Sequence, residues 1–387
     1  MLPASALATR DLTPVADGLH RVAVLMDTRI VSGPARQLAA IIPPLRASGF
    51  DLRVMTFHRA GEPPSAHARF LDELGIPHLV LEDSGPFDAS LFGKVSQALA
   101  EWGPEIVQTH SYRPTTIAAL LRLRRPRWRW VAFFHGTTDE DRKVRLYHWL
   151  DRRLLRYADR VVVMARSQRA RLERDGLARV TVVGNASVLR AVAFQGEPDH
   201  LARLARAPRP RLGVIGRLSP EKGVDVFLEA AMLLRKRGLA FSAGVLGDGP
   251  ERERLLTRAK ALDLDGCVTF FGAEPVVPGT YRELDVVVIP SRSEGLPNVL
   301  LEALSEGCPV VATRVGAIPD VIGDSAAAIL VPPEAPVQLA DAILEATRSG
   351  QRPEVVAERR RVAEAWSLER RVAALVQVYR GVLDGAG

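Results

Sequence analysis

The chain has 387 residues, a hydrophobic share of 47% and a formal net charge of +7. Because one domain usually holds roughly 100 to 200 residues, this length predicts two domains, each able to bury its own core. No apolar run approaches the roughly 20 residues that a membrane-spanning helix requires. Composition therefore argues against an integral membrane protein.

The start of the chain and its cysteines bear on the compartment. Residues 1–20 lack the apolar block of a signal peptide, so they are expected to form a flexible leader. Cys267 and Cys308 lie in apolar, strand-like segments, which favours buried thiols over a disulfide. Free thiols are typical of a reducing compartment, so a cytoplasmic location is expected. The positive charge would attract polyanions, membrane surfaces and phosphorylated substrates, although a genomic bias toward arginine explains it equally well.

Apolar runs that are each followed by a helix-like segment recur along the first half of the chain. This alternation predicts βα units around a parallel sheet. A stretch that contains Gly and Pro at 195–210 then interrupts the pattern and is predicted to be a linker. The predicted strands of the first half are 21–26, 51–57, 105–109, 130–134 and 161–164.

A second βα series follows the predicted linker. Its final helix, expected at 368–383, carries an apolar stripe that is able to brace the two domains. The predicted strands of this half are 212–215, 241–246, 267–271, 285–289, 309–313 and 327–331. The predicted organisation is a leader at 1–20, an N-terminal domain at 21–194, a linker at 195–210, a C-terminal domain at 211–365 and a bracing helix at 366–387.

Polar residues gather just after the predicted strands. In open α/β sheets ligands bind outside the carboxyl ends of the strands, so these positions are the candidates for a binding site. We expect the two domains to present two such edges to each other across a cleft. The candidates are 27–34, His58, His110 and His135 in the first half, and Gly216, Arg217, 247–250, Gly272 and 291–294 in the second.

The segment 291–307 is the most informative of these. It places two carboxylates, Glu294 and Glu302, around the predicted start of a helix. Proline is tolerated in a first helical turn, so Pro297 favours a helix that begins near Leu296. The unpaired N–H groups of that first turn predict an anion site, with Glu302 one turn further along on the face of Asn298. Hydroxyl groups and a phosphate are the expected ligands.

A second cationic feature lies at 216–225. It sets Arg217 and Lys222 five residues apart, with Gly223 opening the next helix. A planar and a flexible cation at this spacing suit a diphosphate, whose charge they would neutralise as it departs. Read alone, the same residues also fit a solvated turn.

These motifs together resemble the retaining GT-B glycosyltransferases of family 4, a large bacterial family. The resemblance covers nearly all of the second half of the chain and, more loosely, the first half. It implies an α/β fold of two Rossmann-like, doubly wound parallel-sheet domains that face each other across a cleft. The second domain would bind a nucleotide-diphosphate sugar, a UDP- or GDP-sugar, and the first would bind the acceptor. The matching motifs are 216–223, 247–250, 294–302 and 307–313.

The same resemblance implies roles for individual residues. Arg217 and Lys222 would contact the diphosphate, Glu302 the ribose hydroxyls and Glu294 the donor sugar. His135 matches the family's cleft histidine beside the donor sugar, and a strand-end histidine bonded to a loop is the alternative. His135, Arg217, Lys222 and Glu294 form the predicted catalytic set, and His110 and His58 are acceptor-side candidates. The other donor-binding residues would be Gly33, Gly216, Gly247, Gly272, Gly295, Leu296, Pro297, Asn298, Val299 and Glu302.

The chain departs from the family pattern at two places. The first-domain loop reads Ser32-Gly33-Pro34, and because proline has no N–H to offer a phosphate, only Gly33 is kept as a candidate there. Where the family often has Asn-Gly-Val-Asp, this chain has Asn185-Ala-Ser-Val188. Asn185 is therefore left out of the predicted site.

Other kinds of protein find less support. Arg252 stands where a dinucleotide fingerprint would need its third glycine, which argues against a dehydrogenase. The acidic pairs at 139–141 and 263–265 lie at predicted helix ends, where capping explains them, and no metal is expected to be required. The charge is not accompanied by a nucleic-acid recognition motif. Basic stretches at 122–130 and 142–160 suggest peripheral contact with an anionic inner-membrane surface, or a solvated helix packed on the sheet.

The predicted function is transfer of a sugar from the nucleotide donor, with retention at the anomeric carbon. The acceptor would be a glycan, a lipid-linked sugar or a small molecule, in the synthesis of cell-surface polysaccharide or glycolipid. Two alternatives stay open. One is a nucleotide-sugar epimerase or hydrolase on the same fold, and the other is a non-catalytic nucleotide-sugar-binding protein of a glycan assembly complex.

Overall fold

The structure is a computed structural model that describes residues 7–10, 18–85, 88–124, 126–136, 152–191 and 198–385. Most of the predicted leader at 1–20, the acidic pair at 139–141 and the first part of the basic segment at 142–160 lie outside the described residues. The chain forms two compact units. The described residues of the first fall within 1–137, 142–184 and 368–387, and those of the second within 185–367.

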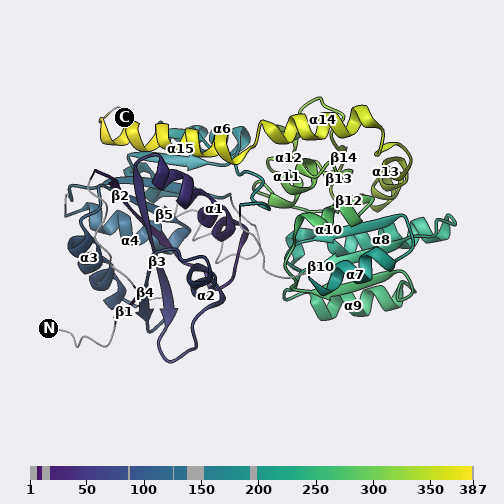
Figure 1. Ribbon diagram of the computed structural model, residues 1–387, viewed down its shortest axis with the longest axis horizontal. Helices are drawn as coiled ribbons and strands as arrows, with labels where there is room; N and C mark the ends of the chain where they lie inside the picture. Colours follow the sequence, from purple (N-terminus) through teal and green to yellow (C-terminus); the bar gives the residue numbers. More distant parts are fainter. Residues whose placement is uncertain are drawn as a thin grey trace. The chain divides into compact units, whose positions relative to one another are not determined.

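The first unit is built on one sheet, in which Figure 1 labels β1 to β5. The strand order is β1-β4-β3-β2-β5-β6-β7-β8. All neighbouring pairs are parallel except β1, which runs antiparallel to β4. The predicted parallel sheet is therefore confirmed. Its strands are β1 Leu7–Arg10, β2 His20–Met26, β3 Phe50–Arg59, β4 His78–Asp83, β5 Ile106–His110, β6 Arg129–Phe134, β7 Arg160–Val163 and β8 Val180–Val182.

Helices connect these strands, and the last helix of the chain joins the same unit. The apolar stripe of α15 packs it against α1 and β6, and the helix spans the predicted range. A bracing role for α15 stays a prediction. The helical segments of this unit are α1 Gly33–Ala47, α2 Ala66–Glu73, α3 Ser90–Trp102, α4 Tyr112–Arg122, η2 Leu155–Tyr157, α6 Arg166–Arg174 and α15 Leu368–Leu383.

The second unit is a fully parallel sheet with the order β11-β10-β9-β12-β13-β14. Both units therefore have the doubly wound, Rossmann-like topology that was predicted. The strands are β9 Arg211–Ile215, β10 Ser242–Leu246, β11 Val268–Gly272, β12 Val286–Ile289, β13 Val310–Thr313 and β14 Ile329–Val331. The helical segments are α7 Asp199–Arg206, η3 Pro220–Lys222, α8 Val224–Lys236, α9 Arg252–Ala261, α10 Pro278–Glu283, α11 Asn298–Ser305, α12 Ile318–Ile322, α13 Pro336–Ser349 and α14 Pro353–Glu364.

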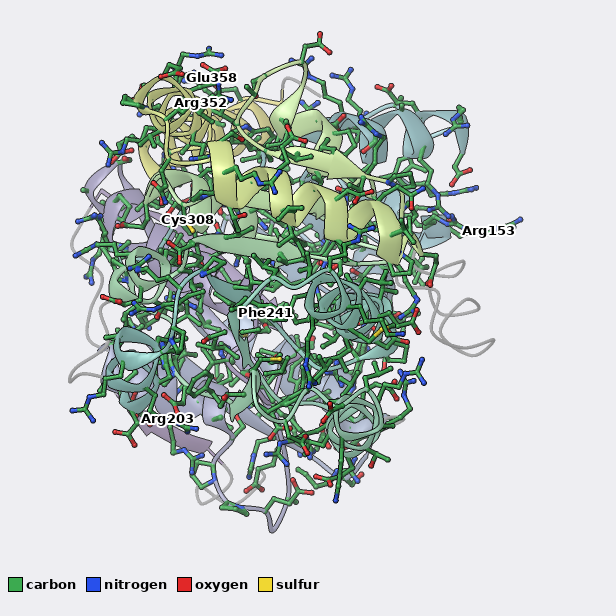
Figure 2. The ribbon with its side chains drawn as sticks, turned by 90° about the vertical axis from the view of Figure 1, so that its right-hand side faces the viewer. Arg153, Arg203, Phe241, Cys308, Arg352 and Glu358 are labelled. Carbon is green, nitrogen blue, oxygen red and sulfur yellow. The ribbon has the colours of Figure 1, made fainter. Side chains whose placement is uncertain are left out.

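The core of the second unit explains why β12 is apolar throughout. All four residues of β12 are buried, as expected for a strand covered on both faces by helices. Cys308, labelled in Figure 2, is also buried, and this burial raises the pKa of its thiol to about 12. Both cysteines are free thiols.

The predicted linker at 195–210 differs from the structure. Residues 192–197 lie outside the description, but α7 occupies residues 199–206 of the predicted linker. His200 and Leu204 on this helix are buried within the second unit, which itself begins at Asn185. The Gly and Pro residues that flank the helix concealed its apolar face, because two buried positions in eight residues give too little periodicity to predict a helix.

The tryptophans of the basic stretch at 122–130 belong to the core of the first unit. Trp128 and Trp130 are 8% and 0% exposed, and the indole Nε1 of Trp130 donates to Thr109 Oγ1 at 3.0 Å. Their rings are therefore not available to a membrane surface. Among the described residues, no helix combines the length and the apolar character needed to cross a membrane.

His67 on α2 gives the first unit an acid-sensitive position. The ring is fully buried, and neither nitrogen has a hydrogen-bond partner among the described residues. Burial lowers its pKa from 6.5 to about 4, with a smaller contribution from His78. As the pH falls from 6.5 toward 4, the unfolded chain therefore takes up a proton that the folded chain does not, so folded-state stability decreases.

We expect the His67→Leu variant to lose less stability in acid than the parent chain. The parent should lose about 2 kcal/mol of unfolding free energy from this residue between pH 7 and pH 4.5. Urea unfolding at the two pH values measures the difference, with the exposed His20→Gln variant as the control. Equal acid sensitivity in parent and His67→Leu would contradict the assignment.

Candidate functional site

The candidate site of the second unit lies where its strand order reverses. From the centre of the sheet, β9, β10 and β11 follow one another toward one edge and β12, β13 and β14 toward the other, so the loops after β9 and β12 lie at the switch point where ligands bind in such sheets. Gly223 lets these loops meet. It has a φ of +62°, and a Cβ there would lie 2.2 Å from the carbonyl oxygen of Pro290.

An ion pair joins the two loops. Lys222, at the end of the 3₁₀ turn η3, places Nζ 2.7 and 2.9 Å from the two carboxylate oxygens of Glu294. Ser291 donates from Oγ to Glu294 Oε1 at 2.7 Å. The Glu294 side chain is only 7% exposed and that of Lys222 28%. The sequence predicted both residues but not that they bind each other.

Arg217, the other predicted diphosphate ligand, is in a different situation. It lies just after β9 on an exposed part of the loop. Its guanidinium has no polar partner within the part of the chain that the structure describes. The candidate site therefore combines one cation already paired with a carboxylate and one cation available to an anion.

The predicted helix after β12 is present but starts later than expected. Helix α11 begins at Asn298, and Pro297 is its N-cap, with an extended ψ of 125°, rather than a residue of the first turn. The start predicted near Leu296 is therefore wrong by two residues. The cause is that the chain stays extended through Pro297, whose neighbour Leu296 is itself buried.

Glu302 lies one turn into α11 and is nearly inaccessible, at 2% exposure. The hydroxyl of Tyr281, on α10, donates to its Oε2 at 2.7 Å. A buried carboxylate is stable only with such partners, so this hydrogen bond holds Glu302 in a fixed orientation.

Asn185 is a residue that the sequence interpretation set aside and that the structure places at this site. Its side-chain Nδ2 donates to the backbone oxygen of Leu296 at 3.1 Å and to Asn298 Oδ1 at 3.0 Å. These contacts hold the chain at the point where it enters α11. The asparagine that follows β8 was the available signal, and it was discounted because the three residues after it depart from the family pattern.

The Asn185→Ala variant should weaken this entry point. Losing the two hydrogen bonds is expected to lower the unfolding free energy by about 1 to 3 kcal/mol. If the segment binds the donor, affinity for UDP should fall as well. Ser187→Ala is the matched control, because Ser187 Oγ contacts Ser305 Oγ at 2.9 Å at the other end of α11. Calorimetric titration and thermal denaturation measure the two effects, and equal behaviour of both variants would contradict the role.

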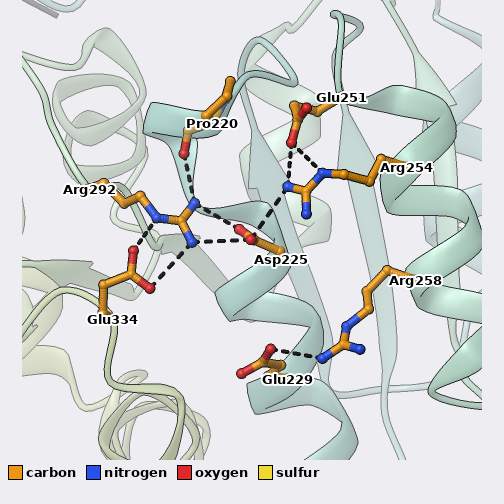
Figure 3. A network of polar contacts seen from close by, with 8 residues as sticks. All are labelled: Pro220, Asp225, Glu229, Glu251, Arg254, Arg258, Arg292 and Glu334. Atoms are coloured by element: carbon orange, nitrogen blue, oxygen red, sulfur yellow. Dashed lines mark hydrogen bonds and ion pairs between the residues drawn. The ribbon is translucent and has the colours of Figure 1, made fainter. Parts of the chain in front are cut away.

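A charged network supports the same loops beside the ion pair, and Figure 3 shows it. Arg292 donates to both oxygens of Asp225, at 2.8 and 3.1 Å, and to the backbone oxygen of Pro220 at 2.7 Å. It also pairs with Glu334, which lies after β14. Arg292 therefore ties together the segments after β9, β12 and β14. Arg292 lay within the candidate range 291–294 but was given no role there.

Gly247, one of the glycines predicted to bind the donor, has a packing role in the structure. Gly247 has a φ of +143°, and a Cβ there would lie 1.8 Å from the carbonyl oxygen of Gly216. Its N–H donates to the oxygen of Gly272 at 2.7 Å. Gly295 accepts from Ala317 N at 2.8 Å. The close approach of the loop backbones therefore requires a glycine at position 247. Val299, another predicted donor-binding residue, lies in the first turn of α11.

In the first unit, the structure joins two predicted histidines and separates a third. His110 ends β5, His135 comes directly after β6, and His110 Nδ1 lies 2.8 Å from His135 Nε2. Burial lowers the pKa of His135 to about 4, with a smaller effect from Arg371, and holds that of His110 well below its usual value. His58, predicted to come after a strand, lies inside β3, and its Nε2 contacts the backbone oxygen of Glu62 at 2.7 Å.

The loop after β2 gives α1 a capped start. Gly33 is the first residue of the helix, and Ser32 Oγ accepts from Ala35 N at 3.3 Å. Asp27, also after β2, contacts Arg113 at 3.4 Å, and Arg113 binds Asp83 at 2.9 Å. Burial raises the pKa of Asp27 despite the nearby guanidinium. Among the described residues, no group of three His, Cys, Asp or Glu side chains is arranged to hold a metal ion.

Comparison with known proteins gives two family matches. The model described as "Glycosyl transferases group 1" matches residues 209–349, and the model described as "Glycosyl transferase 4-like domain" matches residues 32–186. The first covers the loops after β9 and β12, and the second covers both His110 and His135.

Curated relatives agree with these families. The chain is 30% identical to an alpha-D-kanosaminyltransferase of Streptomyces kanamyceticus over 62% of this chain and 60% of the relative. It is 29% identical to a putative colanic acid biosynthesis glycosyltransferase, WcaL, of Escherichia coli over 64% and 59%. The matched part of the chain thus spans about 60% of the length of these relatives. An amylovoran biosynthesis glycosyltransferase of Erwinia amylovora matches at 26% identity over 85% and 77%.

Solved structures share the fold. Anabaena Alr3699/HepE in complex with UDP-glucose superposes with a TM-score of 0.79 at 19% identity, over 93% of this chain and 99% of that chain. Sucrose-phosphate synthase from Thermosynechococcus elongatus gives 0.78 at 18% identity, over 95% and 100%. These likenesses establish the fold of two Rossmann-like units that is named GT-B.

Proposed function

We propose that this chain, which belongs to the group 1 glycosyl transferases, moves a sugar from a nucleotide-diphosphate donor to an acceptor hydroxyl with retention at the anomeric carbon. The observation that carries the proposal is the ion pair of Lys222 with Glu294, which joins the loops after β9 and β12, together with the exposed Arg217 on the loop of Lys222. A nucleotide-sugar donor carries hydroxyl groups, which carboxylates bind, and a diphosphate, which cations bind, so both kinds of side chain are needed in one site.

The proposed chemistry depends on the leaving group. The bond between the anomeric carbon and the diphosphate oxygen breaks, the acceptor oxygen forms the new bond to that carbon, and the acceptor proton passes to the departing phosphate. Arg217 and Lys222 neutralise the charge that grows on the diphosphate, and the N-terminus of α11 adds backbone N–H donors. Lys222 must then exchange one of its contacts with Glu294 for a phosphate oxygen.

The carboxylates would hold hydroxyl groups. Glu302, fixed by Tyr281, is assigned to the ribose, and Glu294 to the donor sugar. Gly33, His58 and His110 remain candidates of the first unit, which is proposed to bind the acceptor, and His135 is proposed to contact the reacting sugar. The UDP-glucose complex of Anabaena Alr3699/HepE supports a UDP-sugar as the first donor to test, ahead of a GDP-sugar. No metal ligand is assigned.

The names of the relatives support an acceptor in cell-surface polysaccharide or glycolipid synthesis. We propose that the enzyme works in the cytoplasm and reaches a glycan or lipid-linked acceptor at the inner face of the plasma membrane. Flotation with anionic liposomes at low salt tests this contact. Protein that stays at the bottom of the gradient would remove the membrane from the proposal.

The decisive experiment is a thermal-shift screen across UDP- and GDP-sugars, because a donor stabilises the state that it binds. Hits are then assayed for release of the nucleoside diphosphate with and without pools of glycan, lipid-linked and small-molecule acceptors. Release that requires an acceptor, with the sugar found on it, supports the proposal. Full turnover without an acceptor would identify a hydrolase or epimerase, and binding without product would identify a binding protein.

A further inference from the structure

A continuous series of hydrogen-bonding side chains runs through the interior of the first unit, from α15 to His135. The hydroxyl of Tyr379 donates to Gln108 Oε1. Gln108 Nε2 lies 2.7 Å from His110 Nε2, and His110 Nδ1 lies 2.8 Å from His135 Nε2. Tyr379, Gln108 and His110 are 0%, 0% and 4% exposed, so no bulk water competes for these contacts.

The amide of Gln108 sets the direction of every hydrogen bond in this series. An amide nitrogen only donates, so His110 Nε2 must accept. Both histidines are neutral at pH 7, because burial lowers their pKa values, and a neutral ring has one donor and one acceptor nitrogen. His110 Nδ1 therefore carries the proton and donates to His135 Nε2. His135 must then carry its own proton on Nδ1.

Tyr379 contributes a donor to the orientation that the amide of Gln108 has in the structure. A phenol hydroxyl that donates to Oε1 leaves Nε2 directed at His110, whereas the reversed amide would direct its oxygen there and reverse each later bond in the series. Tyr379 is itself held in place because its ring packs on Phe50, with 5.1 Å between the ring centroids. The amide oxygen thus accepts a hydrogen bond from a residue 271 positions away in the chain.

We propose that Tyr379 and Gln108 are positioning residues that act through His110 to hold His135 in the tautomer with its proton on Nδ1. The proposal rests on the proposed function for the use of His135 in sugar transfer. Among the described residues, none accepts a hydrogen bond from His135 Nδ1, so this N–H is available to a ligand.

This tautomer limits what His135 can do. At Nδ1 it offers a hydrogen bond to a sugar oxygen and has no lone pair to take a proton, while its Nε2 is occupied by His110. His135 is therefore a neutral donor and not the general base. The acceptor proton is left to the departing phosphate, in agreement with the proposed chemistry.

Nitrogen NMR of the histidines tests the arrangement without any substrate. The full-length, ¹⁵N-labelled chain is examined at pH 7.5 by long-range ¹H–¹⁵N correlation, with His110→Gln and His135→Gln to assign the signals. We expect the protonated-nitrogen shift at Nδ1 and the unprotonated shift at Nε2 for both rings. A mixture, or a proton on Nε2 of His135, would overturn the proposal.

Two variants test whether the series causes the tautomer. Gln108→Leu removes the fixed donor to His110, and Tyr379→Phe removes the hydroxyl that donates to the amide oxygen. Each should give a mixture of tautomers at His135. Tyr157→Phe is the matched control, because Tyr157 lies on η2 and is 59% exposed. A pure Nδ1 tautomer in folded Gln108→Leu would show that the series does not set it.

Turnover with UDP-glucose, or with the donor found active in the screen, tests the use of the tautomer. We expect kcat to fall by about 10- to 100-fold in Gln108→Leu, with a donor KM within about 2-fold of the parent. Losses of this size are typical when a group that fixes the tautomer of a functional histidine by a hydrogen bond is removed. Changed tautomers with an unchanged kcat would overturn the positioning role. An inactive parent with the expected NMR signature would instead count against the proposed function.

Discussion

Replacing Lys222 with alanine should lower turnover by about 100- to 1,000-fold at saturating donor, the size of effect seen when one group that stabilises a developing negative charge is removed. The cause is that Lys222 supplies a positive charge beside the place where the diphosphate departs. Donor affinity should fall less than kcat, because the charge on the leaving group is greatest in the transition state. Steady-state kinetics with the donor from the screen measures both.

Controls separate this chemistry from folding. Lys222→Ala also removes the cation that pairs with Glu294, whose side chain is 7% exposed, so its unfolding free energy must be measured alongside. Lys260→Ala removes an equal charge from the exposed surface of α9 and should leave turnover unchanged. Lys222→Arg, which keeps the charge, should recover part of the loss. Parent-like kcat in Lys222→Ala would rule out the assigned role.

Arg217 provides a second comparison within the same loop. Because its side chain has no polar partner among the described residues, Arg217→Ala should reduce turnover without lowering stability. Lys222→Ala should reduce both. This contrast distinguishes the loss of a diphosphate ligand from the loss of a contact that joins the loops after β9 and β12.

Glu302→Ala should weaken binding of UDP by about 10- to 100-fold, the loss expected for one or two hydrogen bonds to a charged group. The reason is that a buried carboxylate oriented by Tyr281 is an effective acceptor for two ribose hydroxyls. Isothermal titration with UDP and with UDP-glucose measures the loss.

The partner of Glu302 gives the control. Tyr281→Phe keeps the carboxylate and removes only the hydroxyl that donates to it at 2.7 Å. It should lower stability by about 1 to 3 kcal/mol, since a buried oxygen loses its donor, and reduce UDP affinity less than Glu302→Ala does. UDP affinity that is unaffected in Glu302→Ala would exclude the ribose assignment.

Strand positions were predictable because parallel strands buried on both faces are short, apolar and regularly spaced. Residues 212–215, 285–289 and 309–313 all fall on strands of the second unit, within a residue at each end. Strand β4 was missed because His78 and Glu82 break its apolar run, and α7 because its flanks contain Gly and Pro. A short stretch of sequence therefore predicts a buried strand or helix only where apolar residues dominate it.

The residues of the candidate site also divide into those that the sequence predicted and those that it did not. Lys222, Glu294 and Glu302 were predicted because charged residues beside strand ends and glycines form motifs that are local in sequence. Asn185 and Arg292 were not, because their importance lies in contacts with partners such as Leu296, 111 residues away, and Asp225, 67 residues away. No window of sequence contains both ends of such a contact.

By itself the sequence determined the two parallel-sheet units, the edge of each sheet that carries polar residues, and the charges available at that edge. These depend on the alternation of apolar and polar residues along the chain, which is a local property. Only the tertiary structure decided that Lys222 binds Glu294, that Asn185 holds the start of α11, and that Tyr379 reaches His135 through Gln108 and His110. The direction of each hydrogen bond depends on which donors and acceptors the folded chain brings within about 3 Å, and that is settled by packing between distant segments.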